Sequence, residues 1–293
     1  MDAADSPLVR KHFDISGCSV TYYEGGRRES RPLLLMHGVG PGASVLGAFA
    51  NILPFLARHF HVFGMDFVGF GASSQKPSPP YFDFELWVSQ AHALTRLMPA
   101  GDLFIFGHSL SGAIALRLAA ELPRVKAVIT TGTAGTQYPL NKDLERLWTY
   151  PTSPAELREC LRSLIFDERI VSDAILGERW AILSSGSYGS YFARMFSGDK
   201  QSLMDSWVIP DDTLRAIDVP VTLVHGRNDL PCPAESTSLR LAERIRHSDV
   251  ILLSRCGHAP SMEQPKKVMA AVELAFGAFV DFDSVARDGL RSI

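Results

Sequence analysis

The stretch LFIFGHSLSG, residues 103–112, decides the fold of this 293-residue chain. Its first four residues are apolar and predict a strand buried on both faces. Leu110, Ile114 and Leu118 then recur every four residues, which predicts a helix that begins directly after Ser109. Glycine and other small residues surround this serine, as a sharp and strained turn between a strand and a helix requires. We therefore expect Ser109 to lie at such a turn.

Other short apolar runs predict the remaining strands of the sheet. Uncharged runs are typical of strands covered on both faces, and they occur at Leu33–Met36, Leu103–Phe106, Ala127–Thr130, Val221–Val224 and Val250–Leu253. His61–Met65 is more mixed, and the alternation in Ser19–Glu24 predicts an antiparallel edge strand. Helical patterns lie between the runs, including Glu235–Arg246 and Lys266–Val280. Alternating strands and helices predict an α/β fold, with a mostly parallel sheet flanked by helices.

The alternation stops between about residues 136 and 212. Helical patterns at Pro154–Ile165 and Val171–Leu183 dominate this segment, which is rich in aromatic residues. We expect 136–212 to form an inserted helical cap on a core made of 1–135 and 213–293. Most of its large apolar side chains should pack internally, while a few should line a pocket between cap and core, where small-molecule sites commonly form.

Composition narrows the classes of partner. The 29 Lys and Arg residues against 32 Asp and Glu give a net charge of −3, and no basic run predicts a nucleic-acid partner. The start, MDAADSPLVR, has no apolar signal core, and no stretch reaches the roughly 18 apolar residues of a membrane span. We expect no membrane contact and a cytoplasmic location. The four cysteines lack metal-site spacing, so we expect free thiols and no metal.

Ser109 needs a base, because a serine hydroxyl is a poor nucleophile until its proton is removed. His258 follows the predicted strand Val250–Leu253 by five residues, in a glycine-preceded turn. Asp229 is the only carboxylate in the segment that follows Val221–Val224. The chain order of serine, acid and histidine matches one known arrangement of the catalytic triad. The alternatives are a surface-loop histidine and an exposed turn aspartate.

Two backbone N–H groups are candidates for the oxyanion hole. The N–H of Leu110 opens the predicted helix, and we expect the N–H of Val39, from His37-Gly38-Val39-Gly40, to be the second donor. His37 and His108 are interpreted as residues that position these two turns. Cys256 is interpreted as structural. No catalytic context is evident for the other histidines: His12, His59, His61, His92, His225 and His247.

Three motifs resemble the meta-cleavage product hydrolases, which belong to the α/β-hydrolase enzymes. HGVGPGA, residues 37–43, is similar to the family's H-G-x-G-P-G-[AV], the most specific of the three. DFVGFGAS, residues 66–73, resembles the superfamily's common D-x-x-G-x-G-x-S. Arg179-Trp180 resembles an R-W pair of the cap, whose arginine binds the acidic dienol end of the substrate.

The resemblance implies an α/β-hydrolase fold with an eight-stranded sheet, and an enzyme without metal or organic cofactor. It implies hydrolysis of a carbon–carbon bond in a vinylogous 1,5-diketone acid, formed when a dioxygenase opens a catechol ring. The enol would become a ketone, Ser109 would attack the remaining carbonyl, and water would clear the acyl-enzyme. The implied partners are a small-molecule substrate and a second copy in a homodimer. The implied substrate-binding residues are Gly40, His108, Arg179 and Trp180.

Several residues depart from the family pattern. Ser111 replaces the second glycine of G-x-S-x-G, while His108 and Ala48 stand where the family often has asparagine. Ala259 replaces a frequent tryptophan, which predicts a roomier pocket or a different product end. A carboxylesterase, lactonase or amidase with the same triad therefore stays open. A third alternative is a non-catalytic receptor or scaffold, which would not need to retain the triad.

Overall fold

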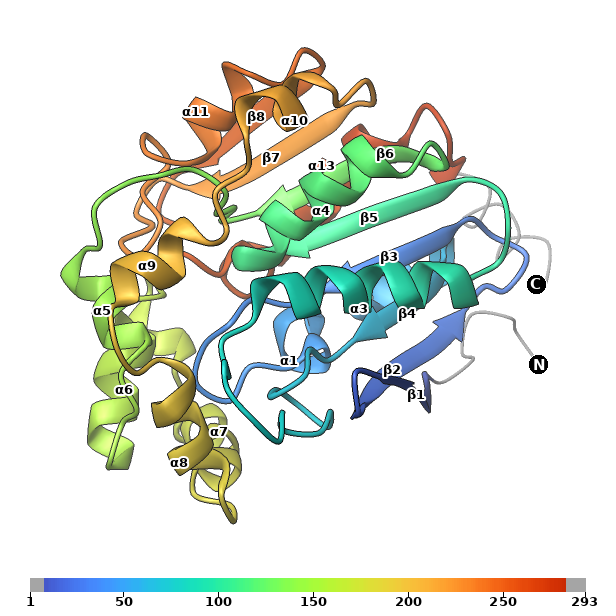
Figure 1. Ribbon diagram of the computed structural model, residues 1–293. Coiled ribbons are helices and arrows are strands. Elements are labelled where there is room, and N and C mark those ends of the chain that lie inside the picture. The colour runs from blue at the N-terminus through green and yellow to red at the C-terminus, as the bar shows by residue number, and fades with distance from the viewer. Residues whose placement is uncertain (1–7, 283–293) are drawn as a thin grey trace, which may run out of the picture.

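An eight-stranded sheet forms the centre of the computed structural model, which describes residues 8–282 (Figure 1). The strand order is β1-β2-β4-β3-β5-β6-β7-β8. All neighbours from β4 to β8 pair in parallel, whereas β2 is antiparallel to both β1 and β4. The predicted, mostly parallel sheet is confirmed. The strands are β1 (Val9–Ile15), β2 (Cys18–Gly26), β3 (Pro32–Met36), β4 (His61–Met65), β5 (Leu103–His108), β6 (Val125–Thr131), β7 (Val221–Gly226) and β8 (Ser248–Leu253).

Helices cover both faces of this sheet. Buried side chains of α3, α4 and α11 pack in one cluster, while those of α1, α2 and α13 pack in a second cluster on the opposite face. The apolar runs of β3 and β5 fit between these clusters because residues 32–36 and 103–107 are all buried. The helices of the two faces are α1 (Val45–Phe49), α2 (Leu53–His59), α3 (Phe84–Leu97), α4 (Leu110–Glu121), α11 (Ser238–Ala242), α12 (Pro260–Glu263) and α13 (Pro265–Phe276).

Both edges of the sheet differ from the prediction. The strand predicted at Ser19–Glu24 is antiparallel, but β1 covers it and forms the edge. Charged side chains at alternate, exposed positions of β1 conceal its strand pattern in the sequence. Val250–Leu253 was predicted as a central strand, whereas β8 is the opposite edge and only its last residue is buried. A short apolar run does not reveal whether another strand lies beyond it.

Two helix predictions are too long. The predicted Glu235–Arg246 contains only the short helix α11, because Thr237 has a non-helical backbone and the preceding residues form turns. The predicted Lys266–Val280 is helical only to Phe276, and Gly277, a residue that destabilises a helix, follows its end. Neither error affects the order of the elements.

A helical segment joins β6 to β7, and no strand occurs in it within the described residues. Figure 1 shows α5 to α9 gathered beside the end of the sheet to which the parallel strands lead. Its division from the core at residues 136 and 212 stays a prediction. No helix of residues 8–282 is long and apolar enough to cross a membrane. The helices are α5 (Lys142–Leu147), α6 (Pro154–Arg162), the 3₁₀ helix η2 (Glu168–Ile170), α7 (Asp173–Leu183), α8 (Tyr188–Met195), α9 (Lys200–Asp205) and α10 (Asp211–Arg215).

Candidate active site

Ser109 occupies the turn between β5 and α4, as predicted. Its φ of +59° lies in the left-handed region. This conformation costs a residue with a Cβ about 1–3 kcal/mol and persists only where surrounding contacts hold it. The N–H of Ser109 donates to the Thr131 carbonyl at 2.8 Å, and its own carbonyl accepts from Gly112 and Ala134. A Cβ on Gly107 would lie 2.5 Å from the Ser111 carbonyl oxygen, so the preceding position requires glycine. These contacts hold the strained turn.

Ser109, His258 and Asp229 lie together in a hydrogen-bonded row. The Ser109 hydroxyl donates to His258 Nε2 at 2.9 Å, and His258 Nδ1 donates to Asp229 Oδ2 at 2.7 Å. All three are buried, at 8%, 3% and 5% exposure. Because the carboxylate only accepts, it fixes the tautomer that leaves Nε2 free to take a proton from serine. This is the geometry of a serine, histidine and aspartate triad.

Asp229 also contacts two groups that the sequence did not indicate. The Cys232 N–H donates to Oδ1 at 2.9 Å, and His225 Nε2 lies 3.0 Å from Oδ2. Burial alone would raise the pKa of Asp229, but the charge of His258 and hydrogen bonds from His225 and His258 outweigh it and hold this pKa well below its usual range. Asp229 is therefore ionised at neutral pH.

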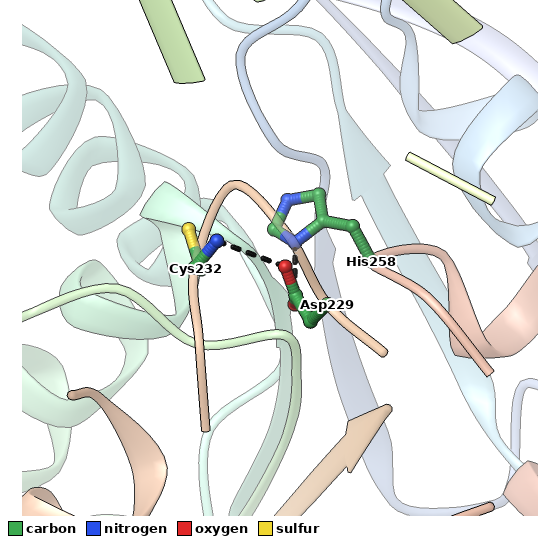
Figure 2. Close-up of side chains that lie close together, drawn as sticks. All are labelled: Asp229, Cys232 and His258. Atoms are coloured by element: carbon green, nitrogen blue, oxygen red, sulfur yellow. Dashed lines mark hydrogen bonds and ion pairs between the residues drawn. The ribbon is translucent and has the colours of Figure 1, made fainter. Parts of the chain in front are cut away.

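Figure 2 shows Asp229, Cys232 and His258 close together, with the Cys232 N–H and the His258 ring directed at the carboxylate. The ligand atoms of these three residues lie within 4.8 Å of one another, a spacing that a metal ion could bridge. Asp229 accepts from the Cys232 N–H at 2.9 Å and from His258 Nδ1 at 2.7 Å, so both of its oxygens already have donors. Hydrogen bonding to Asp229 explains the cluster better than a metal site.

The loop after β3 lies directly against the Ser109 turn. A Cβ on Gly38 would be 2.7 Å from the Ser109 Cβ, so only glycine permits this approach. Within residues 8–282, the N–H groups of Val39 and Leu110 donate to no protein acceptor. His37 is buried and fixes the loop: Nδ1 donates to the Gly38 carbonyl at 2.6 Å, and Nε2 accepts from the Phe67 N–H at 3.1 Å. Two backbone donors are thus available beside the serine.

A cavity opens at the triad. The predicted binding residues Gly40, His108 and Arg179 line it. Trp180 does not; it packs half-buried against the apolar cluster of α6 and α7. Successive residues of a helix point about 100° apart, so the side chain after Arg179 is directed elsewhere. A substrate contact of Trp180 therefore stays a prediction of the family resemblance. Other residues that line the cavity are Ala48, Leu147, Leu164, Ala259, Ser261 and Met262.

Arg179 brings a positive charge from α7 to this cavity. Its guanidinium donates to the Pro41 carbonyl at 3.1 Å, and no carboxylate within the described residues pairs with it. Burial lowers the pKa of Arg179, which nevertheless remains charged because an arginine titrates far above neutrality. The guanidinium therefore has donors left for an anionic ligand.

Ser261 is a cavity residue that the sequence reading missed. It is 6% exposed and lies in the first turn of α12, three residues after His258. Its hydroxyl finds no hydrogen-bond partner in the described part of the chain. The closeness of Ser261 to the triad histidine in the sequence was the available signal for a cavity residue. The direction of its side chain, however, depends on the short helix α12.

A sequence model of the alpha/beta hydrolase family matches residues 33–272. The chain belongs to the alpha/beta hydrolase family. It is 28% identical over 269 residues to the 2-hydroxymuconate semialdehyde hydrolase of Pseudomonas sp. CF600, with 92% of this chain and 94% of that one covered. It is 31% identical over 234 residues to the 2-hydroxy-6-oxo-2,4-heptadienoate hydrolase of Pseudomonas putida F1, with 80% and 84% covered.

Solved structures of this hydrolase family agree with the fold. The meta-cleavage product hydrolase of Pseudomonas fluorescens IP01 superposes with a TM-score of 0.85 at 26% identity, covering 92% of this chain and 97% of that one. The 2-hydroxy-6-oxo-6-phenylhexa-2,4-dienoate hydrolase of Rhodococcus sp. RHA1 gives a TM-score of 0.83 at 28% identity, covering 93% and 99%.

Ser111, which departs from the glycine pattern of the family motif, ties β3 to the Ser109 turn. Its hydroxyl donates to the Met36 carbonyl at 2.7 Å and accepts from the His108 N–H at 2.9 Å. We expect Ser111→Ala to lower the free energy of unfolding by about 1–3 kcal/mol, because two buried backbone groups lose a partner. Thermal unfolding measures this loss. Ser206→Ala, which removes an exposed hydroxyl, is the matched control, and equal melting temperatures for both variants would contradict the expectation.

Proposed function

We propose that this protein is a hydrolase that cleaves a carbon–carbon bond in a vinylogous 1,5-diketone acid, a ring-fission product of an aromatic compound. The observation that carries the proposal is Arg179, the one Lys or Arg among the described residues that line the cavity of the Ser109 triad, where no described carboxylate pairs with it. Relatives named for 2-hydroxy-6-oxo-dienoic acids cover most of the chain, and such substrates combine a carboxylate with a distant ketone. The cavity offers Arg179 as a partner for the carboxylate and the Ser109 triad as a partner for the ketone.

Ser109, His258 and Asp229 supply the chemistry in this proposal. After the dienol has become a ketone, His258 takes the hydroxyl proton as Ser109 Oγ bonds to the distant carbonyl carbon. The N–H groups of Val39 and Leu110 bind the oxyanion, each contributing about 3 kcal/mol. Collapse breaks the carbon–carbon bond, and the departing enolate takes the proton from His258. Water then attacks the acyl-enzyme with His258 as base and releases a carboxylic acid.

His108 is proposed to contact the dienol end as a neutral group. Burial, with a smaller effect of the His258 charge, lowers the pKa of His108 to about 3, so it cannot serve as a base at neutral pH. Its Nδ1 lies 3.1 Å from the Thr131 carbonyl, which can only accept, so Nδ1 carries the proton. The Thr131 hydroxyl, also 3.1 Å from Nδ1, accepts from the same N–H in this tautomer, and Nε2 is left as an acceptor for the enol hydroxyl. Gly40 keeps this part of the cavity open, because a Cβ at this position would lie only 3.2 Å from the Leu147 side chain.

The segment 136–212 is proposed to close the cavity as a cap, because Leu147, Leu164 and Arg179 reach the cavity from it. Ala48 and Ala259 are small residues of the same lining and leave room for the substrate. The partner is a small molecule in this proposal. A homodimer stays a prediction of the family resemblance, and a cytoplasmic location stays a prediction from the sequence.

Product analysis in ¹⁸O-labelled water tests the proposed reaction. The purified protein should bleach a coloured ring-fission product and yield two fragments, with one ¹⁸O atom in the new carboxylic acid. Ser109→Ala should yield neither fragment. Bleaching without fragmentation, or hydrolysis confined to carboxylic esters, lactones or amides, would reject the proposal and favour the ester- or amide-cleaving alternative. No turnover of either class would favour a receptor or scaffold.

Arg179→Met should lower kcat/KM for an acidic dienol substrate by about 10–100-fold, because a charge-assisted hydrogen bond contributes about 1.5–3 kcal/mol. Turnover of a neutral nitrophenyl ester should change less than about threefold, since it presents no carboxylate. Arg169→Met is the matched control because Arg169 is exposed and outside the cavity. Equal losses on both substrates would mean that Arg179 only packs the segment against Pro41.

A further inference from the structure

His225, at the end of β7, is buried beside the triad with both ring nitrogens in contact with polar groups. Nδ1 lies 2.7 Å from the Ser238 hydroxyl, on α11. Nε2 lies 2.7 Å from the Cys232 carbonyl and 3.0 Å from Asp229 Oδ2, the oxygen that also receives the His258 proton. A second imidazole therefore contacts the same carboxylate oxygen of the triad acid as His258 does.

The partners of His225 fix its tautomer. A carbonyl oxygen only accepts hydrogen bonds, so Nε2 must carry the proton and donate it to the Cys232 carbonyl, while Asp229 Oδ2 lies 3.0 Å from the same nitrogen. Nδ1 then accepts from the Ser238 hydroxyl. A neutral imidazole satisfies every contact, and the ring cannot turn over without losing them. His225 is thus a fixed N–H donor to the Cys232 carbonyl, with its Nε2 held against Asp229.

We propose that His225 is a positioning residue that holds the Asp229 carboxylate in line with His258 through its Nε2–H. This inference rests on the proposed roles of Ser109, His258 and Asp229 in the hydrolase reaction. His225 touches neither substrate nor reacting atoms in this account, because it is absent from the cavity lining. It acts on the reaction through Asp229 alone.

Asp229 depends on such donors because it is buried and, within residues 8–282, forms its ion pairs with histidines and not with a lysine or arginine. Within the described residues it accepts hydrogen bonds from the Cys232 N–H on Oδ1 and the His258 N–H on Oδ2, and His225 Nε2 lies 3.0 Å from Oδ2. Figure 2 shows the first of these donors and His258 on the carboxylate. Burying a carboxylate is costly unless hydrogen bonds replace its water. Removing the His225 donor would leave Oδ2 free to rotate away from His258.

A shift of Asp229 would also move His258, because the loops that carry these two residues are in contact. A Cβ on Gly226 would lie 2.0 Å from the Gly257 carbonyl oxygen, so the end of β7 touches the residue that precedes His258. The Asn228 N–H donates to the Cys256 carbonyl at 2.9 Å. The Asp229 loop and the His258 loop therefore form one packed unit. His225 and Ser238 attach this unit to α11.

Two variants of equal length separate the N–H donor from the volume of the ring. Glutamine places an amide N–H near the position of Nε2, whereas methionine has a similar length without that donor. The first readout is the rate at which a fluorophosphonate probe labels Ser109, which needs no knowledge of the natural substrate. We expect His225→Met to slow labelling by about 10–100-fold, and His225→Gln to stay within about threefold of wild type.

The second readout is the split between kcat and KM on a ring-fission product. A positioning role predicts a lower kcat and an unchanged KM for His225→Met, with melting temperatures that agree between the two variants. Where the methionine variant does not fold, Ser238→Ala releases Nδ1 and should slow labelling by about 3–10-fold.

Labelling of a folded His225→Met at the wild-type rate would overturn the inference, and so would equal losses in the glutamine and methionine variants. Wild-type protein that the probe does not label would instead reject the proposed Ser109 nucleophile, a separate failure. Labelling without ring-fission turnover would reject only the proposed substrate, while the effect of His225 on labelling would still be measured.

Discussion

Ser109→Ala is expected to lower kcat on a ring-fission product by about five to six orders of magnitude, the scale seen when a nucleophile is removed from such a triad. Alanine retains the turn but has no oxygen to bond to the substrate carbonyl. The His258 ring would remain on Asp229, at the 2.7 Å contact of the wild type. Initial rates at saturating substrate, together with fluorophosphonate labelling, measure the effect.

The control for Ser109→Ala is Ser206→Ala, which removes an exposed hydroxyl outside the cavity. Its rates should match those of wild type. Residual activity of Ser109→Ala should come only from the oxyanion donors and from substrate binding. A Ser109→Ala variant that the probe still labels at the wild-type rate would show that another residue is the nucleophile.

Asp229→Asn is expected to lower kcat by about four orders of magnitude. The amide can donate its N–H₂ to His258 Nδ1, which places the ring proton on Nε2, facing Ser109. The ring could then no longer accept the serine proton, and no negative charge would stabilise the imidazolium. Substrate KM should change little because Asp229 does not line the cavity.

Asp212→Asn makes the same chemical change at an exposed site and should leave kcat at the wild-type value. Circular dichroism and thermal unfolding would establish that the Asp229→Asn variant is folded. A folded Asp229→Asn variant within about tenfold of wild-type kcat would contradict the role of Asp229, since the tautomer would then not limit the reaction.

The triad could be predicted from the sequence because each member follows a strand of a parallel sheet. Such strands end at one edge, so residues as distant as Ser109 and His258 are brought together by fold topology alone. The central strands could be predicted equally well, because a strand that is buried on both faces has an uncharged apolar run in the sequence. Ser111 kept the turn, and the hydroxyl it adds found partners on β3 and β5.

The contacts that the sequence did not predict depend on side-chain direction or on neighbours absent from the local pattern. His225 belongs to the apolar end of β7 and gives no sign that Nε2 turns toward Asp229. Ser261 reaches the cavity through a single turn of α12. Trp180 matched a motif but lies on another side of α7 than Arg179. The edge positions of β1 and β8 depend on which strands pair, and local sequence does not encode that order.

The most direct test of the account compares kcat/KM for a panel of coloured 2-hydroxy-6-oxo-dienoic acids with kcat/KM for nitrophenyl esters of similar size. If carbon–carbon cleavage is the main activity and Arg179 binds the substrate carboxylate, kcat/KM for at least one dienoic acid will exceed kcat/KM for every ester. Faster turnover of the esters than of every dienoic acid would contradict it.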